Sequence, residues 1–373
     1  MKKTIILLSS LAIAVTTFSG GKEIIPPEDN VIVKEVFVER PVYRNILNGG
    51  YLNMFYRWWG ESSSYSRYDQ KHYNRSGNRG RLQIDGLINL TEQQSIYFRI
   101  RDNQSISDIG DGRNRSGENT QVRMRYMYNH EFTSLNATSR LHYQNTGEYI
   151  GDGPVVKGDE NFEYQFRMQF VENGFDNDFV KTTNLVIAPK VGYSWDHSSS
   201  SNHHASSPYY GLNIEFHNQL PWNFSLEINT FITQVHSNNK YYDGKRDNFS
   251  VSGEVFLKNK TPLWTGDKAT LSFVFEGGLD PYVYSLRKVF DHSNGAGYEH
   301  GKNMAIRDRS SGTDKYNYSV FAVPALQIDY QATENINLYV AAGAEMRNIY
   351  EVGSEAQGFE WQPTAWAGFR SRF

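Results

Sequence analysis

The sequence alternates apolar and polar residues in segments of strand length, and this repetition limits the fold more than any other feature. In residues 162–170, FEYQFRMQF, every even-numbered residue is large and apolar, and every odd-numbered residue is polar or charged. Successive side chains of a strand point to opposite faces, so the segment has one apolar and one polar face. The pattern recurs in segments of roughly ten residues, the length that a tilted strand needs to cross a bilayer. We therefore expect an all-β, transmembrane, antiparallel up-and-down β-barrel.

The alternation begins near Gly50 and predicts about 14 strands, with roughly 12 to 16 as the range. The strand predicted at 269–276 either ends there or continues past Asp280 and Pro281 as a bulged strand. The predicted strands are 51–59, 81–90, 95–101, 121–129, 137–144, 162–170, 183–195, 210–217, 224–233, 249–258, 269–276, 316–330, 336–347 and 361–373.

The connections between these strands alternate in length. Tight turns are expected at 91–94, 131–135, 219–223 and 331–335. Long polar loops are expected at 61–80, 102–119, 145–160, 198–207, 237–247, 291–314 and 348–358. Short periplasmic turns and longer extracellular loops are typical of bacterial outer-membrane barrels. The third long loop, 145–160, either folds into the barrel or lies on the surface as an ordinary loop.

The N-terminal residues predict export. Two lysines precede a short apolar stretch, and small residues at 19–21 supply a cleavage site, so we expect a signal peptide at 1–21. A periplasmic extension is expected at 22–48 and the barrel at 49–373. These features predict the outer membrane of a Gram-negative bacterium, with its lipid as a partner.

Composition agrees with a barrel and excludes several classes of chemistry. Hydrophobic residues make up 39% and aromatic residues 14% of the chain, as suits strands that need apolar side chains at alternate positions and aromatic residues at the interfaces. The absence of cysteine excludes disulfides and thiol nucleophiles. The net charge of -3 and the lack of a basic motif give no indication of a nucleic-acid partner.

Two terminal motifs resemble a known family. The stretch YRWWGE at 56–61 and the C-terminal GFRSRF, which follow a proline-bearing prefix, are similar to the fusobacterial major outer-membrane porins of the FomA type. The resemblance implies a general diffusion porin, a homotrimer, and loops that contact host or bacterial surface partners. It also implies that Phe373 is the terminal aromatic residue that the barrel-assembly machinery recognises.

The polar faces of the predicted strands carry charges that segregate along the chain. Strands in the first half, with the last strand, supply arginines: Arg57, Arg81, Arg99, Arg101, Arg123, Arg125, Arg140, Arg167, Arg370 and Arg372. Later strands supply carboxylates: Glu215, Glu227, Glu254, Glu276, Asp329 and Glu345. The exceptions are Asp85 and Glu163 among the arginines, and Lys258 and Arg347 among the carboxylates. One hypothesis is a transverse electric field across a water-filled lumen. The alternative is that a wet lumen needs polar residues and that their charges are placed by chance.

These observations favour a porin that allows passive diffusion of small hydrophilic solutes and ions. The alternative is an outer-membrane adhesin that acts through its loops. A barrel enzyme is a third hypothesis, with His142 and His217 as the residues to question, but no catalytic set can be assigned around them. We expect no enzymatic activity, no metal site and no cofactor.

Overall fold

The computed structural model describes residues 48–60, 79–105, 119–132, 135–149, 156–198, 206–238, 240–241, 243–288, 315–350 and 356–373. The signal peptide and almost all of the predicted periplasmic extension lie outside these residues. Within the described ranges, no helix is both long and apolar enough to span a membrane.

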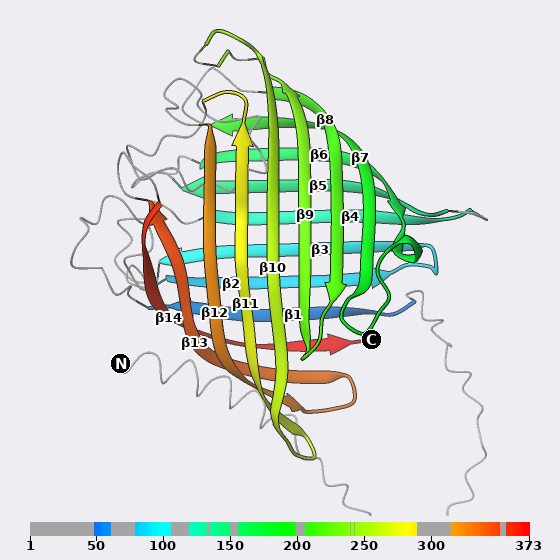
Figure 1. Ribbon diagram of the computed structural model, residues 1–373, viewed down its shortest axis with the longest axis vertical. Helices are drawn as coiled ribbons and strands as arrows, with labels where there is room; N and C mark the ends of the chain where they lie inside the picture. The colour runs from blue at the N-terminus through cyan, green and yellow to red at the C-terminus, as the bar shows by residue number, and fades with distance from the viewer. Residues whose placement is uncertain are drawn as a thin grey trace, which may run out of the picture. The chain divides into compact units, whose positions relative to one another are not determined.

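Fourteen antiparallel strands form a closed barrel in which each strand pairs with its neighbours in sequence and β14 pairs with β1 (Figure 1). This confirms the predicted fold class and strand number. The strands are β1 (Gly50–Trp59), β2 (Arg79–Asn89), β3 (Gln94–Ser105), β4 (Asn119–Glu131), β5 (Asn136–Tyr149), β6 (Val156–Gln169), β7 (Lys181–Ser198), β8 (Ser206–Gln219), β9 (Phe224–His236), β10 (Asp247–Thr265), β11 (Ala269–Ser285), β12 (Tyr316–Gln331), β13 (Ile336–Tyr350) and β14 (Ala356–Arg372).

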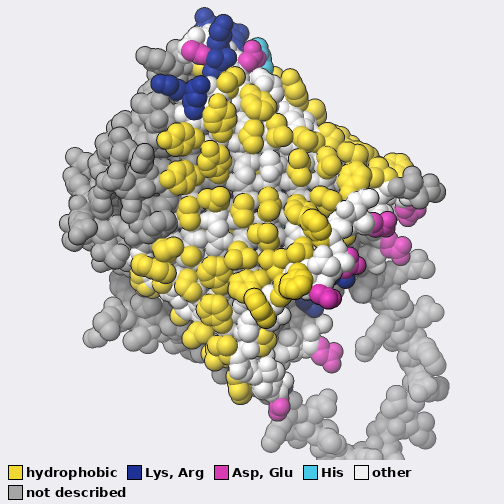
Figure 2. Space-filling model, in the orientation of Figure 1, with side chains coloured by type: hydrophobic (Ala, Val, Ile, Leu, Met, Phe, Trp, Pro, Cys, Tyr) yellow, Lys and Arg dark blue, Asp and Glu magenta, His cyan; other side chains and the backbone are white. Residues whose placement is uncertain are grey.

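The outer face of the barrel is apolar because the alternation of each strand places its large hydrophobic side chains there. Met124, Val191, Leu326 and Val340 are among them, with exposed fractions of 49, 56, 51 and 50%. Figure 2 shows hydrophobic side chains spread over the face formed by the strands at the front of Figure 1. Such a surface is stable when lipid covers it.

One end of the barrel carries the short turns and the junction where the barrel closes. In the turn that joins β8 to β9, Trp222 and Asn223 both have positive φ, of 57° and 61°, as the two central residues of a type I′ turn require. At the junction, the Gly50 N–H donates to the Phe373 carbonyl at 2.9 Å. The last residue of the chain therefore completes the ring at this end.

Several strands extend beyond the ends first expected from the sequence. The continuation past Asp280 is present, because β11 runs to Ser285 with a register irregularity between Leu279 and Tyr282. The predicted third long loop is wrong: β5 and β6 remain paired as far as Tyr149 and Val156, so most of 145–160 is strand. The strand predicted to end at 258 instead continues to Thr265.

Candidate functional site on the inner face of the barrel

The strand register places all the charged residues predicted to line the lumen on one face of the sheet. Arg57 lies directly opposite Arg81, Arg99 opposite Arg123, and Glu276 opposite Lys258. Because directly paired residues point to the same side of a sheet, the register can be followed around the closed ring. This face is the inner one, since it is opposite to the exposed apolar face. It carries Arg57, Arg81, Arg99, Arg101, Arg123, Arg125, Arg140, Arg167, Arg370, Arg372, Glu215, Glu227, Glu254, Glu276, Asp329 and Glu345.

Ion pairs join the arginine-rich and carboxylate-rich sides of the wall at both of their boundaries. At the first boundary, Arg57 of β1 reaches past β14 to Glu345 of β13, with 3.1 Å between Nη2 and Oε2. The Trp59 indole N–H donates to the same oxygen at 2.7 Å, and Arg347 donates to the other carboxylate oxygen at 2.9 Å. Glu345 is only 5% exposed, so its charge is satisfied by three donors.

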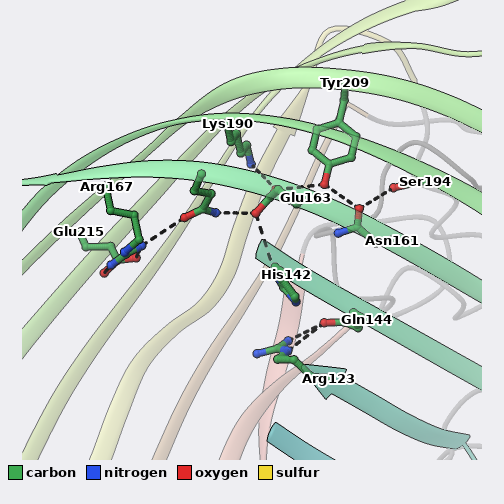
Figure 3. Close-up of polar contacts among 11 residues, drawn as sticks. Arg123, His142, Gln144, Asn161, Glu163, Arg167, Lys190, Ser194, Tyr209 and Glu215 are labelled. Atoms are coloured by element: carbon green, nitrogen blue, oxygen red, sulfur yellow. Dashed lines mark hydrogen bonds and ion pairs between the residues drawn. The ribbon is translucent and has the colours of Figure 1, made fainter. Parts of the chain in front are cut away.

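The second boundary has the same arrangement. Arg167 of β6 reaches past β7 to Glu215 of β8, and its two terminal nitrogens each donate to one carboxylate oxygen at 2.7 Å (Figure 3). Parallel double hydrogen bonds of this kind are the strongest form of arginine–carboxylate contact. Each boundary is therefore fixed by a pair that spans an intervening strand.

Three carboxylates of the carboxylate-rich side are paired with cations of the same side. Lys258 lies 2.7 Å from Glu227, and Lys260 lies 2.8 Å from Asp329. Together with the Arg347–Glu345 contact, these pairs place a cation beside a carboxylate on strands β9, β10, β12 and β13. Glu227, Asp329 and Glu345 therefore each have a neutralising cation on the same side of the wall.

The arginine-rich side is held by neutral amides instead. We call Arg99, Arg101, Arg123, Arg125 and Arg140 the arginine cluster; its members lie on β3, β4 and β5. Three of them donate to glutamine side-chain oxygens. The distances are 2.6 Å from Arg101 to Gln83, 2.6 Å from Arg99 to Gln121, and 3.0 and 2.7 Å from Arg123 to Gln144. Within the described ranges, no member of the cluster forms an ion pair with a carboxylate.

The two carboxylates that border the arginine cluster bind other donors. Asp85 is directly opposite Arg99 in the register, yet its Oδ1 accepts from Asn53 at 3.2 Å and from Gln83 at 2.7 Å. Glu163, on the other border, lies in a separate buried network (Figure 3). Neither carboxylate is close enough to pair with a cluster arginine.

The Glu163 network includes residues that the sequence alone did not single out. Glu163 accepts from the Tyr209 hydroxyl at 3.0 Å and from Gln165, and the Lys190 ammonium lies 3.8 Å away. The oxygen of the same hydroxyl lies 2.6 Å from Asn161 Oδ1, so the two acceptors share its single proton. Asn161 and Glu163 belong to β6, Lys190 to β7 and Tyr209 to β8, and Figure 3 shows these four side chains pointing toward one another.

Within the described residues, the two histidines singled out from the sequence lie apart and contact a carboxylate or amide groups. His142 lies with its Nδ1 3.9 Å from Glu163, and His217 contacts the amides of Asn184 and Asn229 at 3.4 and 3.0 Å. In the part of the chain that the structure describes, no three His, Asp or Glu side chains are grouped so as to hold a metal ion.

Comparisons with known proteins give likeness of architecture only. No family model matches the chain, and no curated protein matches it. Among solved structures, CdiB from Acinetobacter baumannii is 10% identical with a TM-score of 0.42, over 87% of this chain and 60% of that chain. A bacterial polysaccharide outer membrane secretin is 7% identical with a TM-score of 0.33, over 87% and 98%. OmpT, an outer membrane protein of Vibrio cholerae in its trimer form, is 8% identical with a TM-score of 0.31, over 88% and 100%.

The fold and its two faces define a class of protein, although no family is shown. A closed antiparallel barrel with an apolar outer face and a charged inner face is consistent with an outer-membrane β-barrel protein.

Proposed function

We propose that this protein is a porin of the Gram-negative outer membrane, through which small hydrophilic solutes and ions diffuse passively. The observation that carries the proposal is the charged inner face of a fourteen-stranded ring. Barrels of about eight strands are filled by their own side chains, whereas barrels of sixteen to eighteen strands leave an aqueous channel. A ring of intermediate size lined by arginines and carboxylates supports a wet lumen, because ionised groups are costly to keep away from water.

The described chain supports this proposal in a second way. Apart from the 3-10 turn Val171–Asn173, every regular element within the described ranges is a strand of the wall. The charged residues therefore lie on the wall of one continuous ring. We further propose that the protein acts as a homotrimer, without enzymatic activity, and that Phe373 is read by the barrel-assembly machinery.

Planar-bilayer recording with purified full-length protein tests the porin function. Stable stepwise increases in conductance are expected, and graded polyethylene glycols that enter the lumen should lower the step size, which gives the size cutoff. Folded protein that inserts without conductance steps would contradict the porin function. If the same protein bound host or bacterial cells, the adhesin would become the better proposal.

A further inference from the structure

The arginine cluster combines crowding with a lack of ionic compensation. Arg99 and Arg123 are direct partners across β3 and β4, and Arg101 and Arg125 follow on the same face two residues away. Like charges directly opposite each other destabilise a sheet. At Arg57 and Arg167, by contrast, the chain pairs the arginine with a carboxylate, Glu345 and Glu215 respectively. In the cluster it provides only amide oxygens.

Glutamines hold three guanidinium groups of the cluster in place, those of Arg99, Arg101 and Arg123, and the cluster still has donors to offer. Arg123 is 7% exposed, and Gln144 fixes it through Nε and Nη2, which leaves its other terminal nitrogen. The Nε atoms of Arg99, Arg125 and Arg140 are buried and have no hydrogen-bond partner among the described residues. A buried donor without a partner costs free energy that an acceptor would recover.

We propose that the arginine cluster is a binding site for small multivalent oxyanions, such as phosphate, on their way through the lumen. Arginine presents planar forks of N–H donors that match the oxygens of phosphate and carboxylate groups. An oxyanion with several oxygens can accept from arginines on neighbouring strands at once, which chloride does less well. Because the cluster faces inward, the ligand is a solute of the lumen. This inference deepens the proposed porin function by naming a class of solute.

Equilibrium dialysis of radiolabelled inorganic phosphate against the full-length protein in detergent tests the site directly. Wild-type protein should bind phosphate saturably. The double variant Arg99→Gln/Arg123→Gln should bind at least about tenfold more weakly, as expected for the loss of charge-assisted hydrogen bonds. The matched control is Arg370→Gln/Arg372→Gln, which removes two exposed inner-face arginines of β14 outside the cluster and should bind like wild type.

Further arms keep the test decisive. Heat-modifiable migration on gels shows whether each variant is folded, and Arg99→Lys/Arg123→Lys keeps the charge without the fork, so it should restore part of the affinity. Phosphate added during bilayer recording at constant chloride should lower the conductance saturably. Non-saturable uptake by wild-type protein, or equal losses in the cluster and control variants, would overturn the site. Conductance without saturable binding leaves the porin function standing, whereas binding without conductance overturns the porin function alone.

Discussion

The two sides of the inner wall carry charge in different ways. The side from β9 to β13 holds carboxylates with lysine or arginine partners close by, as in Glu227–Lys258 and Asp329–Lys260. In the arginine cluster of β3 to β5, three of the five arginines donate to glutamines, which orient the guanidinium groups but do not cancel their charge. The inner wall is therefore not two equal and opposite surfaces. The charge that has no nearby counter-ion, and the electric field it produces, come mainly from the arginine cluster.

This difference sharpens the hypothesis of a transverse field. Two ranks of opposite charge would orient dipolar solutes while leaving ion selectivity modest. The carboxylate-rich side, which we call the acidic arc, has cations close to its carboxylates, whereas the arginine cluster has no such compensation. The lumen should therefore attract anions. The ion pairs at the two boundaries, Arg57–Glu345 and Arg167–Glu215, hold these unlike regions in register.

The largest expected effect comes from breaking a boundary. Glu215→Gln removes the carboxylate that accepts hydrogen bonds from both terminal nitrogens of Arg167. The Arg167 side chain is only 15% exposed. Leaving a largely buried cation without its partner should lower the free energy of unfolding by about 2 kcal/mol. Urea unfolding in detergent micelles, followed by tryptophan fluorescence, measures the change.

An exposed ion pair provides the control for that prediction. Asp176→Asn breaks the contact with Lys181. The Asp176 side chain is 82% exposed and the Lys181 side chain is 66% exposed. Exposed pairs contribute little, so its effect should stay within about 0.5 kcal/mol. Equal destabilisation by the two variants would show that the boundary pair has no special weight.

Much of this arrangement could be predicted from sequence because lipid imposes a strict period on the wall. Alternation placed the arginines and carboxylates on one face, since every second residue must be apolar where the strand contacts lipid. The boundary pairs could not be predicted in the same way. Arg57–Glu345 and Arg167–Glu215 each span an intervening strand, and their distance depends on the closure and stagger of the ring.

The residues that sequence missed lie where the alternation fails. Lys190 follows Val186 and Ala188, which occupy inner positions and are 4 and 0% exposed, so the face of that strand was blurred. Lys260 lies past the predicted end of its strand, in a hairpin that continues to Thr265. The paired residues at 145–149 and 156–160 lack apolar alternation. Where a strand extends beyond the apolar belt, it does not contact lipid and needs no alternation of apolar and polar residues. Its sequence then resembles that of a loop.

The next effect concerns selectivity. Replacing Arg99, Arg101, Arg123 and Arg125 together by glutamine removes most of the uncompensated charge and should shift the permeability ratio toward cations by about tenfold, or about 1.4 kcal/mol. Reversal potentials in a salt gradient measure the shift, and salt should weaken it through screening. An unchanged reversal potential would refute both the field and the asymmetry between the two sides.

The smallest effect tests whether the acidic arc is neutralised locally. Lys258→Gln leaves Glu227 without its cation, so the reversal potential should move toward cations by about twofold in permeability ratio, because a partly exposed pair is screened by water. Removing both partners, in Lys258→Gln/Glu227→Gln, leaves the net charge of the wall unchanged. The double variant should therefore return to the wild-type reversal potential.

The single Glu227→Gln variant completes the cycle and should shift the potential in the opposite direction, toward anions. Local cancellation requires the two single shifts to be equal and opposite and to cancel in the double variant. If Glu227→Gln alone changed nothing while Lys258→Gln had its full effect, the lysine would act on the lumen as a free charge. The acidic arc would then resemble the arginine cluster, and the contrast between the two sides of the wall would be lost.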